Sequence, residues 1–220
     1  GMFKKVVIAD SLAGSVDFIF DSYQSLDGGI LLLGLIYFSF QIYCDFSGYS
    51  DIAIGTAKLF GIEIMSNFKF PYLSRDICEF WRRWHISLSS WFRDYLYIPL
   101  GGSKRGRWIS IRNIFVIFIV SGFWHGANWT FIIWGLTHAL LYIPLYLIGK
   151  NRQYTTNAVS ENNWFPSIKE LFQMGITFIS TTIAWVFFRS ESISNGFEYL
   201  SIMVSKFSIP THERSGIVFI

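Results

Sequence analysis

The stretch from Ile114 to Gly149 contains no Asp, Glu, Lys or Arg, and this feature restricts the chain to few kinds of fold. About 20 mostly apolar residues are enough for a helix to cross the hydrocarbon core of a bilayer. The stretch is too long for one ordinary span, and SGFWHGANW interrupts it. We therefore predict a helix that ends near Phe123, a break at residues 126–128 and a second helix from about Trp129 to Leu147.

Two other segments, residues 28–44 and residues 171–188, are also uncharged and just long enough to span a membrane. Directly after residues 28–44, Asp45, Asp51 and Lys58 interrupt short apolar runs, so this part is not a simple lipid-facing helix. Charged residues make up 15% of the chain, whereas soluble domains carry about a quarter. The predicted fold class is all-α, as a polytopic membrane protein.

The remaining segments are connections and one surface helix. Residues 150–163 are polar and predict a surface loop. Residues 195–207 have the pattern of an amphipathic helix, and a turn-rich connection follows them.

Basic residues are concentrated in the segment between Arg75 and Arg112. Eight bases stand there against three acids, Asp76, Glu79 and Asp94; the bases are Arg75, Arg82, Arg83, Arg93, Lys104, Arg105, Arg107 and Arg112. Membrane proteins keep an excess of Lys and Arg in their cytoplasmic segments. We therefore expect this segment to face the cytoplasm.

Several functional classes receive no support. The net charge of +3 is too small to indicate a nucleic-acid partner, and no glycine-rich nucleotide motif occurs. Cys44 and Cys78 form no CxxC pair, and no two histidines have the spacing of a metal-binding helix, so no metal is expected. The chain also lacks the G-x-S-x-G motif of serine hydrolases.

His125 is the strongest candidate for a catalytic residue. It lies in FWHGAN between two uncharged spans, where non-helical backbone must be satisfied by protein or water. A neutral imidazole at this position could accept a proton from a hydroxyl group. The alternative is a hydrogen-bonded structural histidine, which is the more frequent role of a histidine in an apolar run.

The other three histidines have weaker support. His85 lies in EFWRRWHIS, where Glu79 can pair with Arg82 or Arg83 at helical spacing; a single amphipathic helix at the cytoplasmic surface would explain this pattern equally well. His138 fits best as a structural histidine between helices. His212 lies in a polar turn without supporting residues.

Four motifs resemble the membrane-bound O-acyltransferase (MBOAT) family, especially its bacterial alginate O-acetyltransferase-like branch. They are QIYCDFSGYSDIAIG, NFKFPYLSRDICEFWRRWHISLSSWFRDYLYIPLGG, GFWHGANWTFIIWG and AWVFFR. The resemblance implies a helical bundle with a central tunnel and interfacial or re-entrant helices. It places the essential histidine of the family at His125 and a second recurrent histidine at His85.

The resemblance also implies an activity, which is acyl transfer to a hydroxyl of an extracytoplasmic polysaccharide or of a partner acetyltransferase. His125 would be the general base and His85 a second site residue. The positive charge of Arg82 and Arg83 on the expected cytoplasmic side, and not the resemblance, predicts that these two residues bind the anionic donor. That donor would be an acyl-CoA or acyl-carrier thioester, and no bound cofactor is expected. The alternatives are D-alanyl or other acyl transfer to a wall polymer, and a non-catalytic acyl conduit serving a partner transferase.

The same resemblance implies a multi-pass protein of the bacterial cytoplasmic membrane. Family members are about twice as long and begin with several more spans. We therefore expect residues 1–220 to form one partial transmembrane domain, from the centre to the C-terminal part, without the N-terminal spans and the extreme C-terminus.

Overall fold

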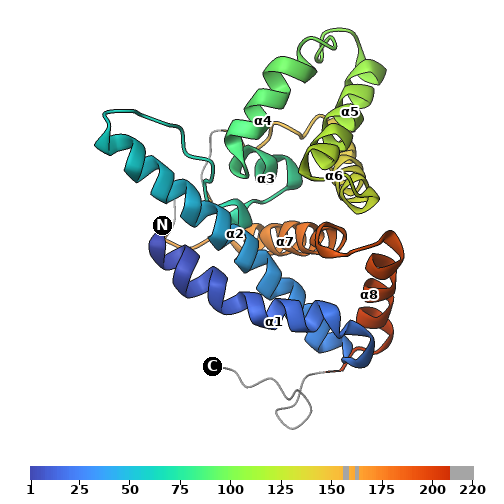
Figure 1. The fold of residues 1–220 in the computed structure, drawn as a ribbon. Helices are drawn as coiled ribbons and strands as arrows, with labels where there is room; N and C mark the ends of the chain where they lie inside the picture. Colours follow the sequence, from blue (N-terminus) through green and yellow to red (C-terminus); the bar gives the residue numbers. More distant parts are fainter. Residues whose placement is uncertain (156–158, 162–163, 209–220) are drawn as a thin grey trace. The chain divides into compact units, whose positions relative to one another are not determined.

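The computed structural model describes residues 1–155, 159–161 and 164–208. Helices are the regular elements among these residues, and no strand occurs there (Figure 1). Within the same residues, four helices are long and apolar enough to cross a membrane: α2 (Gly28–Leu59), α5 (Arg107–His125), α6 (Trp129–Leu147) and α7 (Ile168–Arg189). The predicted all-α class is confirmed.

Contacts divide the chain into two compact units. The first holds residues 1–64 together with the described residues from 185 onward, and the second holds residues 65–184. Helix α7 begins in the second unit and ends in the first. The prediction of one domain over residues 1–220 is a statement about the family fold that this division does not test.

The first unit contains two short helices and three long ones. These are η1 (Phe3–Ala9), α1 (Asp10–Asp21), η2 (Tyr23–Ser25), α2 and α8 (Ile193–Ser205). Tyr199 of α8 is 1% exposed and donates its hydroxyl hydrogen to the carbonyl oxygen of Leu31 at 2.7 Å. Its ring stacks on Phe20 with centroids 4.7 Å apart, so α1, α2 and α8 share one aromatic core.

Helix α2 continues without interruption through the charged segment that follows residue 44, although the uncharged run alone predicts a shorter span. Two lysines of η1 explain the continuation. Lys5 pairs with Asp45, and Lys4 lies 2.8 Å from Asp51. Gly48 allows this approach, because a Cβ atom there would lie 2.9 Å from the carbonyl oxygen of Gly1. Each of these two carboxylates thus has a cation beside it, and both pairs are solvent-exposed.

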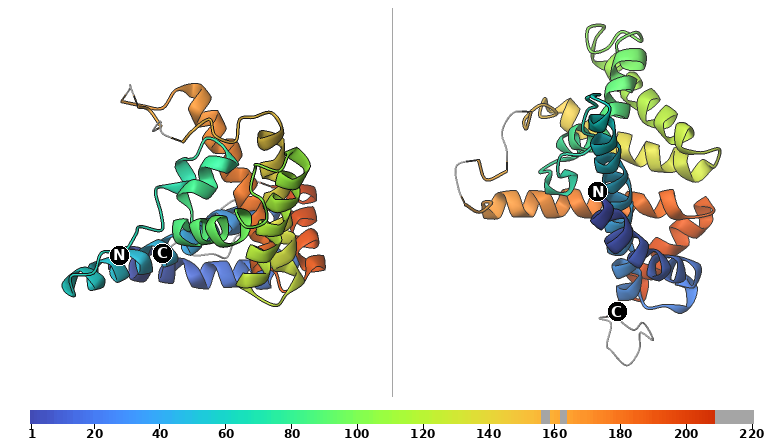
Figure 2. Two further views of the ribbon diagram at one scale, coloured as in Figure 1. Left: turned by 90° about the horizontal axis from the view of Figure 1, so that it is seen from above. Right: turned by 60° about the vertical axis from the view of Figure 1, so that its left-hand side comes forward.

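The second unit contains η3 (Pro71–Leu73), α3 (Ile77–Arg83), α4 (Ile86–Phe92), η4 (Arg93–Tyr97), α5, α6 and most of α7. The predicted order of helix, break and helix is confirmed over α5 and α6, which lie side by side (Figure 2). Helix α5 ends at His125, two residues beyond the predicted end, so the histidine belongs to its last turn.

Two glycines bring α5 and α6 into backbone contact. A Cβ atom on Gly122 would lie 2.2 Å from the carbonyl oxygen of Phe131, and one on Gly135 would lie 2.2 Å from that of Phe118. Small residues serve this purpose in membranes, where close van der Waals packing is a main source of helix association. The position of His125 therefore depends on a tightly packed helix pair.

We expect the substitution Gly135→Ala to destabilise the protein by about 1–3 kcal/mol, because the added methyl group forces α5 and α6 apart. Thermal unfolding of the purified protein in lipid nanodiscs measures this effect. Gly175→Ala is the matched control, since a Cβ atom on Gly175 of α7 meets nothing within 4 Å. Equal melting temperatures for the two variants would contradict the packing role of Gly135.

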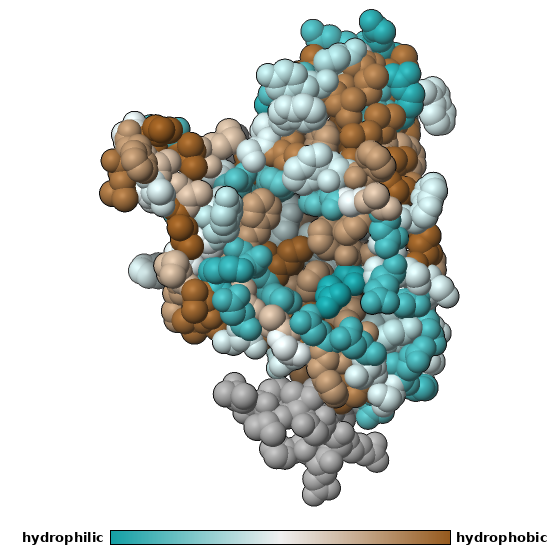
Figure 3. All heavy atoms as spheres, in the orientation of Figure 1, coloured by the Kyte–Doolittle hydropathy of each residue, from teal (hydrophilic) through white to brown (hydrophobic). Residues whose placement is uncertain are grey.

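Helix α7 includes the predicted span over residues 171–188, and α8 the predicted amphipathic helix. Large apolar side chains on α7 are exposed, namely those of Phe172, Ile176 and Ile179. Figure 3 shows hydrophobic and hydrophilic residues side by side on the surface of the face drawn. Residues 151–154, in the predicted surface loop, form a turn. His212 and most of the turn-rich connection predicted around it lie outside the described residues.

Candidate active site

The segment that contains His85 is two short helices and not one. Asp76 caps α3 by accepting a hydrogen bond from the Glu79 amide at 2.7 Å. Helix α3 ends at Arg83, and His85 then adopts a left-handed backbone conformation with φ 45°. The interpretation as a single surface helix is therefore wrong. A left-handed histidine is energetically unfavourable unless its surroundings hold it, and such residues are frequent at functional sites.

Backbone hydrogen bonds hold this junction from both sides. The amide of Lys69 donates to the carbonyl oxygen of Arg83 at 3.0 Å, and the amide of Ile86 donates to that of Asn67 at 3.1 Å. The segment that contains Asn67 and Lys69, before η3, thus holds Arg83 and Ile86 in place on either side of Trp84 and His85.

The structure brings His85 and His125 to the same place. The Trp124 ring contacts both, with its centroid 6.0 Å from that of His85 and 5.0 Å from that of His125. Burial lowers the pKa of His85 to about 4, and repulsion from His125 adds to the effect. His85 is therefore neutral at pH 7, which suits a residue beside a proton acceptor.

The break between α5 and α6 sets the surroundings of His125. Asn128 caps α6 by accepting a hydrogen bond from the Thr130 amide at 3.2 Å. Gly126 leaves room for Phe131, because a Cβ atom there would lie 2.4 Å from the Phe131 ring. The Trp134 ring meets that of His125 edge to face at 5.1 Å. Aromatic rings therefore fix the imidazole against the start of α6.

His138 lies deeper than the other described histidines. It is 0% exposed, and its ring contacts those of Trp81 at 4.9 Å, Trp134 at 5.0 Å and Phe118 at 6.2 Å. This environment supports the structural interpretation made from the sequence.

The two arginines predicted to bind the donor have different contacts. Arg82 donates to the carbonyl oxygens of Asn151 at 2.9 Å and Tyr154 at 3.2 Å. Arg83 donates to the carboxylate of Glu79 at 2.7 Å, so Glu79 selects Arg83 from the two partners that helical spacing allowed. Both arginines also line the cavity described below.

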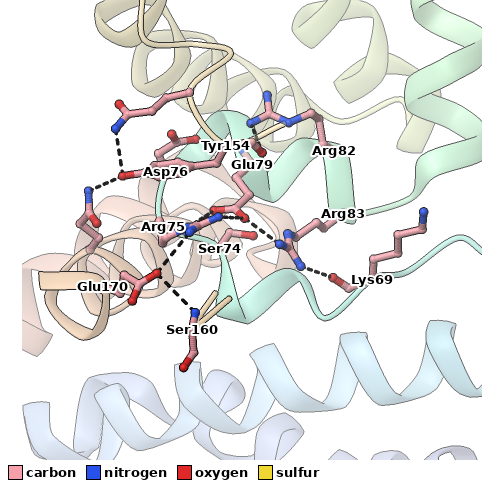
Figure 4. A network of polar contacts seen from close by, with 12 residues as sticks. Lys69, Ser74, Arg75, Asp76, Glu79, Arg82, Arg83, Tyr154, Ser160 and Glu170 are labelled. Carbon is pink, nitrogen blue, oxygen red and sulfur yellow. Dashed lines mark hydrogen bonds and ion pairs between the residues drawn. The ribbon is translucent and has the colours of Figure 1, made fainter. Parts of the chain in front are cut away.

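Glu79 is the centre of a buried ionic network (Figure 4). It is 1% exposed and accepts hydrogen bonds from Arg83 and from the Arg75 guanidinium, which contacts it at 3.0 and 3.1 Å. Arg75 also reaches Glu170 at 3.2 Å and lies over the Tyr154 ring at 4.0 Å. Burial favours the neutral form of Glu79, but these hydrogen bonds outweigh it and hold the pKa of the carboxyl group below its usual range.

A cavity of about 700 Å³ lies within the second unit. Its lining includes Arg82 and Arg83 as well as apolar residues of α5, up to Ser121 one turn before His125. The size is typical of pockets for small organic ligands. Sequence reasoning did not find Lys69, Arg93 and Arg152, which also line it, since no local pattern connects them.

Two other kinds of chemistry have no support at this site. Burial raises the pKa of the Cys78 thiol in the cavity lining to about 12, so this cysteine is protonated at neutral pH and is a poor nucleophile. In the part of the chain that the structure describes, no three His, Cys, Asp or Glu side chains are grouped as metal ligands.

A comparison with known families matches most of the chain. The model of the membrane-bound O-acyltransferase (MBOAT) family matches residues 28–185, which include both helices of the His125 hairpin. The chain belongs to the MBOAT family. This MBOAT chain is accordingly a multi-pass membrane protein, as the sequence predicts.

Several curated relatives of the MBOAT chain are acyltransferases by name. It is 43% identical over 93% of its length to a peptidoglycan O-acetyltransferase of Helicobacter pylori, covering 37% of that protein. It is 45% identical over 88% of its length to a probable alginate O-acetylase of Pseudomonas syringae pv. tomato, covering 35%. A teichoic acid D-alanyltransferase of Bacillus subtilis is 36% identical over 62% of the chain, covering 34%. The chain thus spans little more than a third of these relatives.

Proposed function

We propose that this MBOAT chain carries the site of an O-acyltransferase that moves an acyl group, most simply acetyl, from a thioester to a hydroxyl group. The main support is that the Trp124 ring contacts the rings of both His85 and His125. These residues lie at the end of α5, and one face of α5 lines a cavity of about 700 Å³. The names of the relatives support an acyl group as the cargo.

In the proposed reaction, His125 acts as general base. It takes the proton of the acceptor hydroxyl while the hydroxyl oxygen attacks the carbonyl carbon of the thioester. The tetrahedral intermediate then collapses, the C–S bond breaks, and the thiolate leaves with the proton that His125 had accepted. An ester and a free thiol are the products. His85, held neutral beside Trp124, is assigned a positioning role toward His125.

The direction of transfer is proposed from the charge distribution. The excess of bases between Arg75 and Arg112 favours a cytoplasmic location, where acyl-CoA or acyl-carrier thioesters are available. The acceptor would be a polysaccharide hydroxyl or a partner acetyltransferase outside the cytoplasmic membrane of a bacterium. D-alanyl transfer to a wall polymer remains the second acyl-transfer candidate, because the family includes such an enzyme.

Proteoliposomes that contain the whole protein test this proposal. Labelled acetyl thioester is supplied on the side that carries the Arg75–Arg112 segment, and polysaccharide or the partner protein on the other side. We expect label to appear as an ester on the acceptor, in proportion to the amount of protein. Label that crosses the membrane as free acetate, without ester formation, would contradict acyl transfer and favour a conduit.

A further inference from the structure

The cavity of the second unit has one wall without charge. Its α5 residues are Ile114, Ile117, Phe118 and Ser121, which are spaced so that they share one helix face. His125 follows Ser121 by one turn, at a rise of about 6 Å. Tyr142 and Tyr146 of α6 also line the cavity, so this part of the lining offers apolar surface and hydroxyl groups and extends to Ser121, one turn before His125.

The remaining lining is strongly basic. Five cationic side chains come from the segment before α4, from η4 and from the loop after α6: Lys69, Arg82, Arg83, Arg93 and Arg152. Glu79 is the acid among the lining residues, and Arg75 and Arg83 already bind its carboxylate. The lining thus has a net positive charge of five bases less one acid.

We infer that this cavity selects a donor whose acyl group is uncharged, and that its walls reject an acyl group that carries an ammonium ion. This inference rests on the proposed function. The phosphate of a pantetheine-type thioester binds the basic lining, as arginine and lysine bind phosphate in proteins generally. The acyl group then lies against the uncharged wall that leads to His125.

An ammonium on the acyl group finds no carboxylate in this lining except that of Glu79, which Arg75 and Arg83 already bind. Against the α5 wall it loses water without gaining a carboxylate partner, which is a large penalty for a charge. Near the basic side chains of the lining, the ammonium is repelled by charges of the same sign. The family includes both O-acetyltransferases and D-alanyltransferases, and the composition of this lining favours the neutral cargo over D-alanine.

Binding of three thioesters of 4′-phosphopantetheine tests the inference without any substitution. The acyl groups are acetyl, D-lactyl and D-alanyl; the last two differ chiefly in a hydroxyl against an amino group, which is protonated at pH 6.5. With the whole protein in nanodiscs, we expect D-lactyl to bind within about threefold of acetyl and D-alanyl at least about tenfold more weakly. Equal binding of D-lactyl and D-alanyl would overturn the inference.

A charge reversal identifies the part of the lining that binds phosphate. Arg152→Glu should weaken acetyl-phosphopantetheine about tenfold or more and leave the phosphate-free acetyl-pantetheine unchanged. Arg105→Glu is the matched control, because Arg105 is equally exposed but does not line the cavity. Equal effects of the two variants, or displacement of the thioester by phosphatidylglycerol, would overturn the assignment of the cavity to the donor.

The position of the acyl group has a test of its own. Ser121→Asp should improve D-alanyl binding several-fold, because it places a carboxylate beside the ammonium, whereas the uncharged variant Ser121→Asn should not. If Ser121→Asp folds but binds the D-alanyl thioester no more tightly than Ser121→Asn does, this placement of the acyl group is wrong. These measurements need no acceptor and no turnover, so their failure leaves the proposed acyl transfer standing, and failure of transfer leaves the binding results interpretable.

Discussion

Replacing His125 with alanine is expected to reduce acyl transfer by about 10²- to 10⁴-fold, the usual contribution of a general base. The imidazole is partly exposed at the end of α5, with the aromatic rings of Trp124 and Trp134 on either side, so its removal leaves the helix pair intact. Ester formation in proteoliposomes measures the loss. Protein yield and thermal unfolding should stay at the level of the unmodified protein.

His138→Ala is the matched control for that experiment. His138 is fully buried between Trp81, Trp134 and Phe118, so its truncation should leave a void and lower yield and thermal stability. Undiminished transfer by His125→Ala would favour the conduit, in which partner proteins perform the chemistry. A fall in yield equal to that of His138→Ala would instead indicate that His125 has a packing role.

Glu79→Ala should destabilise the protein by about 3 kcal/mol, the lower end of the usual penalty for breaking a buried ion pair, because Arg75 keeps its contact with Glu170. The Arg75 side chain is 4% exposed. The substitution removes the carboxylate that accepts two hydrogen bonds from the Arg75 guanidinium and one from the Arg75 backbone amide. Thermal or urea unfolding in nanodiscs measures the change. Asp94→Ala is the control, because its pair with Arg93 is exposed and should contribute little.

The same network gives a dependence on pH. Because the folded protein holds the pKa of Glu79 below its usual value of 4.5, the stabilisation is fully present above that pH. It is lost as the pH falls through the lower pKa of the folded state. The isosteric variant Glu79→Gln should therefore show a smaller loss of stability between pH 5 and pH 3, as about one titrating carboxylate is removed. If Glu79→Gln lost as much stability between pH 5 and pH 3 as the unmodified protein, the role of Glu79 would be contradicted.

The spans and the hairpin of His125 could be predicted because their signals are local. A run without charge, a glycine and an asparagine before Trp129 are enough to place two helices and the break between them. The boundary was missed by two residues, since the His125 side chain fits the last turn of α5 as well as the break. The continuation of α2 could not be predicted, because the lysines that pair with its acids are far away in sequence, |i−j|=40 for Lys5 and Asp45 and |i−j|=47 for Lys4 and Asp51.

The candidate site could be predicted only in part for the same reason. Local sequence indicated His125, family resemblance added His85, and the positive charge of their segment added Arg82 and Arg83. The roles of these residues stay predictions. Long-range contacts could not be predicted from local sequence. They include the ring contact of His85 with Trp124, the contacts that hold the break after α3, and the ion pair of Arg75 with Glu170. The Asp-x-x-Glu sequence at the start of α3, Asp76 to Glu79, carried a usable signal, because such a spacing predicts a capped helix start.

The hairpin of α5 and α6 also has a consequence for biosynthesis. The ring contacts of His125 with Trp124, Phe131 and Trp134 lie within nine residues of it along the chain, so closing them costs little loop entropy. Synthesis runs from the N-terminus, so the hairpin can form before α7 leaves the ribosome. The bond between Arg75 and Glu170, |i−j|=95, must wait for α7. The ionic network around Arg75 is therefore completed only after the hairpin of His125 can form.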